Sequence, residues 1–346
     1  MSSSPDIAAA RRPRAIVLGC AGLQLGEAER RFFGEADPLG FILFRRNIET
    51  PDQVRALVDA LRESVGRADA PVLIDQEGGR VARLGPPHWP ALPPARTIGA
   101  LAERDRLAGL GAALAVGRCI GTILAGLGID VVCAPVADLL LAQTHQVIGD
   151  RAYSADPDLV GELARAACTG FLQVGVTPIV KHIPGHGRAT ADSHLELPRI
   201  DADRATLDRT DFAAFRGVRD APWAMVAHCV YAAIDQDRPA SISPIVIEQV
   251  IRGAIGFDGV LIADDIGMKA LKGTLAESAA ATLAAGCNLT LHCSGDLAEM
   301  EAIAPAVPEL TQAAAERLAR GAALRGRVDR LDPAAEADRI YRLLAA

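Results

Sequence analysis

Residues 177–194 read TPIVKHIPGHGRATADSH, and they join an apolar run to a loop rich in glycine and histidine. The run that ends at His182 is short and largely apolar, as expected for a strand buried on both faces. The stretch contains three of the chain's seven histidines, a lysine and an aspartate. Because ionisable groups are costly to bury without partners, packing alone does not explain it. We interpret it as an active-site loop that follows a strand.

The alternation of apolar and helical segments continues along the whole chain. Strands are predicted at Arg14–Cys20, Gly40–Phe44, Pro71–Asp75, Val131–Val136, Thr177–His182, Trp223–His228, Gly259–Asp264 and Leu289–Cys293. Helices are predicted at Pro51–Val65, Leu107–Leu127, Asp156–Val174, Pro244–Ile255, Ala276–Ala285 and Leu310–Ala323. This order predicts the α/β class and a single-domain (β/α)8 barrel, a TIM barrel, over residues 1–346. Within it, residues 1–13 are expected to form a flexible N-terminal arm and residues 329–346 a C-terminal helix. An open doubly wound sheet is the alternative, but no GxGxxG turn follows the first strand.

Ionisable residues lie at the ends of seven of the eight predicted strands. They are Arg45 and Arg46, Asp75, Asp138, Lys181 and His182, His228, Asp264 and Asp265, and His292. In a barrel the C-terminal ends of the strands converge on one mouth, where active sites lie. Helix capping explains one such residue, but it does not explain a succession of seven. The pattern therefore predicts a polar site at the mouth.

The composition excludes several classes of protein. The formal net charge is -7 and no run of lysine or arginine occurs, which argues against a nucleic-acid partner. The apolar run from Ala15 to Ala21 is too short for a signal peptide, and no stretch approaches the ~20 apolar residues of a membrane span. The seven cysteines include no CxxC pair and lie mostly in apolar runs. This usage is typical of reduced thiols in a cytoplasmic protein.

The histidine-rich loop is compatible with two kinds of chemistry. A metal site could use His182, His186, Asp192 and His194. A loop with two glycines is a poor rigid chelator, however, so no metal or other cofactor is expected. In the acid–base alternative, Asp192 lies two residues from His194, and in an extended loop the two side chains point the same way. The carboxylate can then fix the tautomer of the imidazole and raise its basicity.

A pair of carboxylates, Asp264 and Asp265, closes the seventh predicted strand. Successive strand residues point to opposite sides, so one carboxylate can face the barrel mouth while the other caps the next helix. A carboxylate at the mouth could attack a sugar carbon, and retaining glycosidases pair such a nucleophile with a second group that acts as the acid. Here that group would be His194.

These motifs resemble a known family, the bacterial β-N-acetylhexosaminidases of glycoside hydrolase family 3, which act in cytoplasmic cell-wall recycling. The similarity covers the chain from about Gly40 to about Cys293. It rests on residues 75–81 (DQEGGRV), 148–153 (IGDRAY), 181–187 (KHIPGHG), 192–194 (DSH), 256–260 (GFDGV) and 264–265 (DD). The chain departs from the family pattern around the Asp pair, at Ala263 and at residues 266–268, and the segment 292–295 (HCSG) is also less familiar.

The resemblance implies a role for each matching residue. Asp264 corresponds to the nucleophile, His194 to the general acid/base on a mobile loop with Gly185 and Gly187 as hinges, and Asp192 to the partner of His194. The sugar pocket is implied to be lined by Asp75, Arg83, Arg151, Lys181 and His182. For Arg151 and Lys181 the alternative explanation is an ion pair at a strand end. His186 is expected to hold the loop rather than touch the sugar.

The activity implied by the resemblance is that of a retaining exo-β-N-acetylglucosaminidase. It would hydrolyse terminal non-reducing β-linked GlcNAc from peptidoglycan fragments, such as GlcNAc-1,6-anhydro-MurNAc muropeptides, through a covalent glycosyl-enzyme. We expect a monomer whose partner is this small-molecule sugar substrate, with no nucleic acid and no membrane. The alternatives are a β-glucosidase or a GlcNAc phosphorylase of the same family, and a barrel that binds sugars without catalysis.

Overall fold

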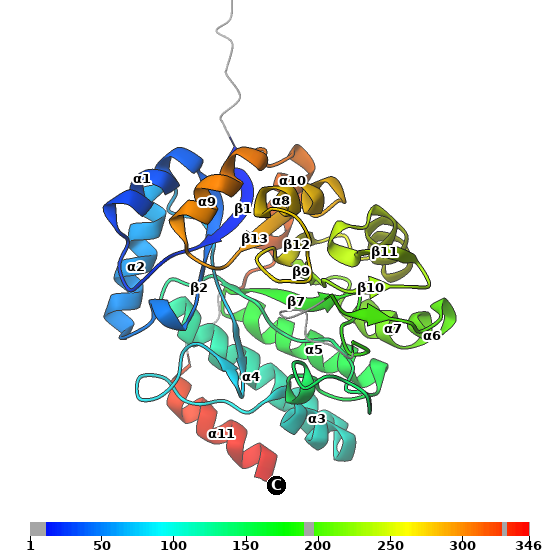
Figure 1. Cartoon of the computed structure of the whole chain (residues 1–346). Helices are drawn as coiled ribbons and strands as arrows, with labels where there is room; N and C mark the ends of the chain where they lie inside the picture. Colours follow the sequence, from blue (N-terminus) through cyan, green and yellow to red (C-terminus); the bar gives the residue numbers. More distant parts are fainter. Residues whose placement is uncertain (1–11, 190–196, 327–330, 346) are drawn as a thin grey trace, which may run out of the picture.

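The computed structural model describes residues 12–189, 197–326 and 331–345, and a closed barrel of eight parallel strands lies at its centre (Figure 1). The strands are neighbours in the order in which they occur in the chain, and the last pairs with the first. They are β1 (Arg14–Gly19), β2 (Pro38–Leu43), β3 (Val72–Ile74), β6 (Val131–Val132), β7 (Thr177–Ile183), β9 (Trp223–Val226), β12 (Val260–Asp265) and β13 (Leu289–His292). Each overlaps a predicted run, so the predicted α/β class and (β/α)8 barrel are confirmed.

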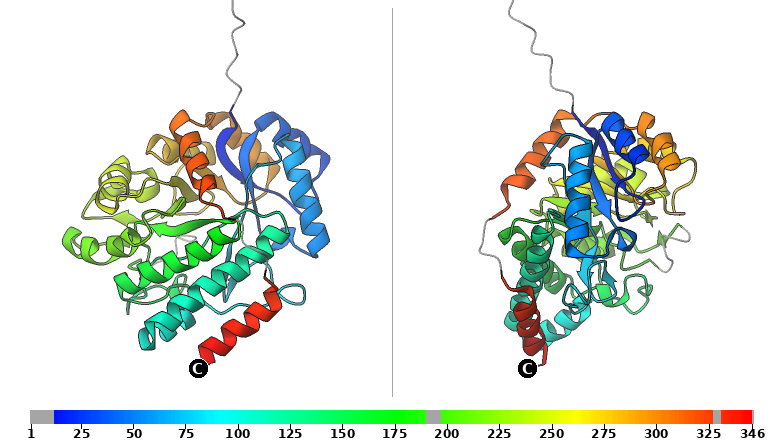
Figure 2. Two further views of the ribbon diagram at one scale, coloured as in Figure 1. Left: turned by 180° about the vertical axis from the view of Figure 1, so that it is seen from behind. Right: turned by 90° about the vertical axis from the view of Figure 1, so that its left-hand side faces the viewer.

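Helices cover the outside of the barrel (Figures 1 and 2). The structure has helices in all six segments where the sequence predicts them: α2 (Pro51–Ser64), α4 (Arg106–Gly126), α5 (Pro157–Gln173), η4 (Val246–Ile255), α8 (Leu275–Ala284) and α10 (Gln312–Ala323). The element η4 is wound as a π-helix rather than an α-helix. Helices that the sequence did not predict are α1 (Glu27–Ala36), α3 (Ala95–Arg104), α6 (Arg204–Arg209), α7 (Asp211–Arg216) and α9 (Leu297–Ile303).

Side-chain caps fix where several of these helices begin. The hydroxyl of Thr50 accepts a hydrogen bond from the N–H of Gln53, and Pro51 occupies the first turn of α2. Asp156 caps α5 in the same way, and a reciprocal Thr274–Glu277 capping box starts α8. These helices begin within one residue of the predicted starts, at Pro51, Asp156 and Ala276.

The two ends of the chain lie at different places on the barrel. Pro13 precedes β1 and its carbonyl accepts a hydrogen bond from Leu310, so this part of the expected N-terminal arm is attached to the barrel. Residues 1–11 lie outside the described residues. The C-terminal helix α11 runs over Pro333–Ala345 and packs on α4 (Figure 2).

Helix α4 is the most apolar helix of the outer layer. By length and composition alone it could cross a membrane, which the sequence analysis did not anticipate, yet 67% of its apolar window is buried in the described structure. It lies along α5 (Figure 2), and glycines allow the close approach. A Cβ at Gly117 would lie 2.4 Å from the carbonyl of Ala167, and one at Gly170 would lie 2.4 Å from that of Leu114. We therefore describe α4 as a core helix of the barrel's outer layer.

Short strands extend the barrel at its C-terminal end. The hairpin of β4 (Gln76–Gly78) and β5 (Val81–Ala82) follows β3 directly, so it begins at the mouth. A second small sheet joins β8 (Arg199–Ile200), β10 (Val230–Tyr231) and β11 (Asp235–Pro239). These additions lengthen the polypeptide that surrounds the mouth, and the β4–β5 hairpin carries part of the site described next.

Candidate active site

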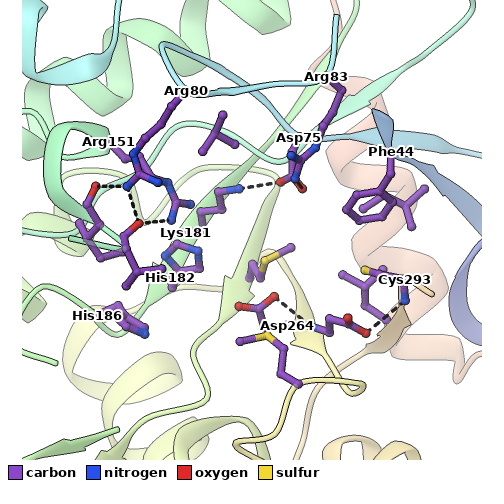
Figure 3. Close-up of a pocket in the computed structure, with 18 residues that line it drawn as sticks. Phe44, Asp75, Arg80, Arg83, Arg151, Lys181, His182, His186, Asp264 and Cys293 are labelled. Atoms are coloured by element: carbon purple, nitrogen blue, oxygen red, sulfur yellow. Dashed lines mark hydrogen bonds and ion pairs between the residues drawn. The ribbon is translucent and has the colours of Figure 1, made fainter. Parts of the chain in front are cut away.

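A cavity of about 350 Å³ opens at the C-terminal ends of the barrel strands (Figure 3). Six predicted site residues line it together: Asp75, Arg83, Arg151, Lys181, His182 and Asp264. An apolar part of the wall comes from Ile42, Phe44, Met225, Met268 and Leu291. The structure thus brings together residues from strands that are far apart in sequence, as the convergence of strand ends predicts.

A continuous ladder of ion pairs forms one side of the cavity. Lys181 Nζ lies 2.8 Å from Asp75 Oδ1 and 2.7 Å from Glu77 Oε1. Arg83 extends the ladder beyond Asp75, at 2.9 Å. At the other end Arg151 makes two hydrogen bonds of 2.8 Å to the two oxygens of Glu77. Three cations and two carboxylates therefore alternate along this wall.

The ladder fixes the charge state of its members. Burial alone would raise the pKa of Glu77, but Lys181 and Arg151 outweigh it and lower that pKa to about 2. For Asp75 burial is likewise outweighed, by Lys181 and Arg83, so its pKa is also well below the ordinary value. The two carboxylates in turn raise the pKa of Lys181 against the effect of burial. All of these groups are charged at neutral pH and offer strong donors and acceptors to a polar ligand.

A buried aspartate holds the imidazole of His182. Asp138 is fully buried after β6, and its Oδ2 lies 2.7 Å from Nδ1 of His182. Its Oδ1 accepts a hydrogen bond of 2.6 Å from the backbone N–H of His186. An ionised carboxylate only accepts hydrogen bonds, so Nδ1 of His182 carries the hydrogen. The other ring nitrogen, Nε2, is the one available to contact a ligand in the cavity.

The side chain of His186 is buried beside His182. The two ring centroids are 5.7 Å apart, and His186 also lines the cavity. Burial, reinforced by the neighbouring His182, lowers the pKa of His186 to about 4. The imidazole of His186 is therefore neutral at neutral pH.

Asp264 and Asp265 end β12 with different surroundings. Asp264 lines the cavity, and its Oδ1 accepts a hydrogen bond of 2.8 Å from the backbone N–H of Asp265. Asp265 Oδ1 accepts hydrogen bonds from the backbone of Gly267, at 3.0 Å, and of Cys293, at 3.1 Å. The prediction that one of the pair caps the next helix is wrong, because α8 begins only at Leu275. The Asp265 carboxylate instead closes a turn and ties β12 to the end of β13.

The imidazoles of His182 and His228 contribute most to stabilising the charge of Asp264, and Lys181 contributes less. Burial opposes its ionisation, but His182 and His228, with the N–H of Asp265, lower its pKa below the ordinary value. His228 is itself fully buried, and its Nε2 lies 3.1 Å from the carbonyl of Asp265 while Nδ1 lies 2.6 Å from the hydroxyl of Ser241. Asp264 is thus an ionised carboxylate at the mouth, and within the described ranges it forms no ion pair with lysine or arginine.

The predicted acid–base pair falls in a part of the chain that the structure does not cover. Asp192 and His194 both lie outside the described residues. The segment that leads to them is firmly packed: Gly187 approaches Leu139 so closely that a Cβ would lie 2.2 Å from its carbonyl, and a Cβ at Gly185 would lie 2.9 Å from Asp211. These glycines, expected to be hinges, are needed for close packing. Arg188 adds an ion pair of 2.6 Å to Asp211.

Two residues of the site were missed by the sequence analysis. Glu77 was part of a quoted motif but received no role, although its position two residues after Asp75 places both carboxylates on the same side of an extended segment. Asp138 was recognised only as a strand-end aspartate. Its bonds to His182 and His186 span more than 40 positions in sequence, so no local pattern reveals them. Both Arg151 and Lys181 form ion pairs and also line the cavity, while their contact with a sugar stays a prediction.

The metal alternative has no support from the described residues, among which no three His, Cys, Asp or Glu side chains form a cluster that could hold an ion. Two of its four proposed ligands, Asp192 and His194, are not among those residues.

The sequence matches a family model described as "Glycosyl hydrolase family 3 N terminal domain" over residues 28–323. Because the match covers most of the chain, the chain belongs to glycoside hydrolase family 3, as the motifs predicted.

Curated relatives indicate which glycosidase activity the chain has. A protein of Alkalilimnicola ehrlichii named "Beta-hexosaminidase" is 37% identical over 283 residues, which are 81% of this chain and 80% of that protein. One of Aromatoleum aromaticum with the same name is 34% identical over 353 residues, covering 99% of this chain and 96% of the relative. The protein is accordingly a glycosidase with β-hexosaminidase activity.

Solved structures agree with this assignment. NagZ from Neisseria gonorrhoeae, in complex with N-trifluoroacetyl-D-glucosamine, superposes with a TM-score of 0.86 at 29% identity and covers 96% of this chain and 99% of its own. A family 3 β-N-acetylglucosaminidase from Paenibacillus gives a TM-score of 0.82 at 30% identity over 95% of this chain and 67% of its own.

Proposed function

We propose that the protein is a retaining exo-β-N-acetylglucosaminidase in which Asp264 attacks the anomeric carbon and forms a covalent glycosyl-enzyme. The observation that carries this proposal is the position of Asp264: a partly buried, ionised carboxylate at the cavity mouth that forms no ion pair with lysine or arginine among the described residues. A carboxylate paired to a guanidinium has its lone pairs engaged, whereas Asp264 keeps oxygen electrons available to form a bond.

The ion-pair ladder fits the binding of a single terminal sugar. A pyranose presents several hydroxyls, and Asp75, Lys181 and Arg151 offer charged acceptors and donors on one wall of a cavity of about 350 Å³. The N. gonorrhoeae protein was solved with an N-acylated glucosamine analogue. From these two points we infer that GlcNAc is the sugar held next to Asp264.

The acid that protonates the leaving group is proposed to be His194, oriented by Asp192. Retaining glycosidases need such a group opposite the nucleophile, and the described cavity supplies no second carboxyl group free of partners. Asp75 is engaged with Lys181 and Arg83, and Asp265 with two backbone N–H groups. A substitution of His194 by alanine is expected to slow substrates with poor leaving groups far more than activated aryl glycosides. Equal losses on both would contradict the assignment.

The natural substrate is proposed to be a peptidoglycan fragment such as a GlcNAc-1,6-anhydro-MurNAc muropeptide, hydrolysed in the cytoplasm during cell-wall recycling. This proposal rests on the resemblance of the motifs to that branch of the family. A monomer is sufficient for it, since all proposed site residues come from one chain.

The test compares initial rates on aryl β-GlcNAc and aryl β-glucoside, and then follows the first-formed product by NMR in buffer containing methanol. We expect turnover of the first substrate, little of the second, and a methyl glycoside of β configuration. An α product would overturn the covalent mechanism, and preference for the glucoside would overturn the sugar assignment. Acceleration by inorganic phosphate, with release of the sugar 1-phosphate, would replace hydrolysis with phosphorolysis.

A further inference from the structure

A second carboxylate–imidazole pair lies behind the cavity, at the end of β13. His292 is 1% exposed, and its Nε2 lies 3.1 Å from Glu299 Oε2 and 2.8 Å from the hydroxyl of Ser294. The same hydroxyl donates a hydrogen bond of 2.6 Å to Glu299. Glu299 belongs to α9, so the pair joins this short helix to the barrel. His292 does not line the cavity, and the binding of substrate does not account for it.

The hydrogen-bond directions orient the imidazole ring of His292. Glu299 can only accept, and the hydrogen of the Ser294 hydroxyl is already directed at Glu299, so Nε2 of His292 must be the donor. The opposite nitrogen, Nδ1, then faces Asp265, at 3.8 Å from Oδ1. Nδ1 is buried and has no hydrogen-bond partner within the part of the chain that the structure describes. Because Nε2 already carries a hydrogen, an N–H at Nδ1 as well makes the ring an imidazolium, which would attract the carboxylates on its two sides, Glu299 and Asp265. A shift of under 1 Å would then complete a hydrogen bond from Nδ1 to Asp265.

Asp265 connects this pair to the proposed nucleophile. Its carboxylate accepts hydrogen bonds from Gly267 and Cys293, which hold the turn after β12 against β13. Its backbone N–H donates to Asp264 Oδ1, and Figure 3 shows Asp264 and Cys293 on the same side of the cavity. The orientation of the Asp264 carboxylate therefore depends on how the Asp265 peptide is held.

We infer that His292 is a positioning residue: as an imidazolium oriented by Glu299 and Ser294, it attracts the Asp265 carboxylate and so holds the backbone N–H of Asp265 that fixes the Asp264 carboxylate. The inference rests on the proposed role of Asp264. Residues 292–295, which carry this arrangement, begin with the last residue of β13 and lead toward α9. A small error in the orientation of the nucleophile is expected to lower the rate of attack more than the affinity for the sugar, because the ladder proposed to bind the sugar lies on another wall of the cavity.

The experiment compares three replacements of His292 by kcat and KM on an aryl β-GlcNAc. His292→Leu removes both nitrogens, and we expect kcat to fall about tenfold with KM within about twofold of the original. In His292→Asn the amide nitrogen can take the place of Nδ1 and donate to Asp265, so most of kcat is expected to return. In His292→Gln the amide reaches toward Glu299 instead, and kcat stays low.

Two more variants on α9 separate positioning from general stability. Glu299→Gln weakens the anchor of the ring, and about a threefold loss of kcat is expected without a change in KM. Glu301→Gln alters an exposed carboxylate of the same helix and is expected to leave kcat unchanged. If His292→Leu does not fold, Glu299→Gln decides the matter by the same split between kcat and KM.

The outcomes distinguish this inference from the function on which it rests. Original values of kcat in His292→Leu and Glu299→Gln, or equal losses in the Asn and Gln variants, would overturn the positioning role. If Asp264→Ala is inactive at the same time, the proposed nucleophile stands and only the role of His292 is lost. If Asp264→Ala is fully active, the proposed function itself fails, whatever the His292 variants show.

Discussion

The two ends of β12 carry aspartates in opposite surroundings. Asp258, just before the strand at the base of the barrel, has a side chain that is 71% exposed and forms ion pairs of 2.9 Å with Arg317 and Arg320. Asp264, at the mouth, is partly buried in the cavity wall and is stabilised mainly by imidazoles and a backbone N–H. The pKa of both carboxyl groups is lowered. For Asp258 the main cause is the hydrogen bond from Arg317. For Asp264 burial would raise the pKa, but His182 and His228 outweigh it.

This difference shows two ways of keeping a carboxylate ionised. At the base, solvated arginines neutralise the charge, and such exposed pairs contribute little to stability. At the mouth, imidazoles, a backbone N–H and, to a smaller extent, Lys181 stabilise the charge without a direct ion pair, so a developing positive charge on a sugar carbon could interact with it. The ladder around Lys181 forms an intermediate case, with largely buried carboxylates that are neutralised by cations and proposed to bind the sugar.

The largest effect is expected from Asp264→Ala. Because it removes the proposed nucleophile and leaves a small space in an already open cavity, kcat on an aryl β-GlcNAc should fall by at least about 10³-fold, with stability changed by less than about 1 kcal/mol. Steady-state kinetics and thermal unfolding measure the two quantities. Asp258→Ala, at the other end of the same strand, is the matched control and should retain full kcat.

Next in size is Glu77→Gln, which breaks the centre of the ladder. Lys181 and Arg151 would then be buried without full compensation of their charge, and loss of one partner of a buried pair costs about 3–5 kcal/mol. Urea denaturation should show this loss together with a raised KM. A variant as stable as the original would show that water enters the ladder and compensates the cations.

The pH dependence of stability should reveal the ionisation of Glu77. The pKa of Glu77 is lowered from 4.5 to about 2 in the folded protein, so its stabilising effect is present above pH 4.5 and is lost as the pH falls toward 2. Over this interval the unfolding free energy of Glu77→Gln should decrease less steeply than that of the original protein. Parallel curves from denaturant titrations at several pH values would contradict the ionisation assigned to Glu77.

A smaller effect is expected from Asp130→Asn at the base. Asp130 accepts a hydrogen bond from the N–H of Val72, at 2.8 Å, and pairs with Arg325 at 3.0 Å and Arg62 at 3.4 Å. The partly exposed ion pairs and the charge-assisted hydrogen bond together should contribute about 1–2 kcal/mol. Thermal unfolding should detect the loss, while kcat and KM stay unchanged; a drop in kcat would mean that the base and the mouth are coupled.

The smallest effect is expected from Asp258→Asn. The side chain is mostly exposed, so losing its pairs with Arg317 and Arg320 should change stability by no more than about 0.5 kcal/mol. High salt should reduce even this difference, because exposed charges are screened. A larger loss in urea denaturation would show that the arginines depend on Asp258 to stay on the barrel surface.

The strands and the polar mouth were predictable because each leaves a local signal. The apolar run 177–182 followed by ionisable residues is sufficient to place Lys181 and His182 at a strand end, and the same holds for Asp75 and Asp264. The short helices α6 and α7 were not predictable, since six residues hold fewer than two turns of any apolar period. The role of Glu77 depends on partners from β7 and from the segment around Arg151, and only the closed barrel brings these together.

The close approach of α4 and α5 affects the distances between side chains at the cavity. These helices lead into β6 and β7. Asp138 follows β6 and His182 lies near the end of β7, and the contact between their side chains is 2.7 Å. Gly117 and Gly170 lie in the outer layer of the barrel, and they set the distance between α4 and α5. A methyl group at either glycine would push the two helices apart, although Gly117 precedes His182 by 65 positions and Gly170 by 12. The length of a contact at the cavity thus depends on two residues that have no side chain.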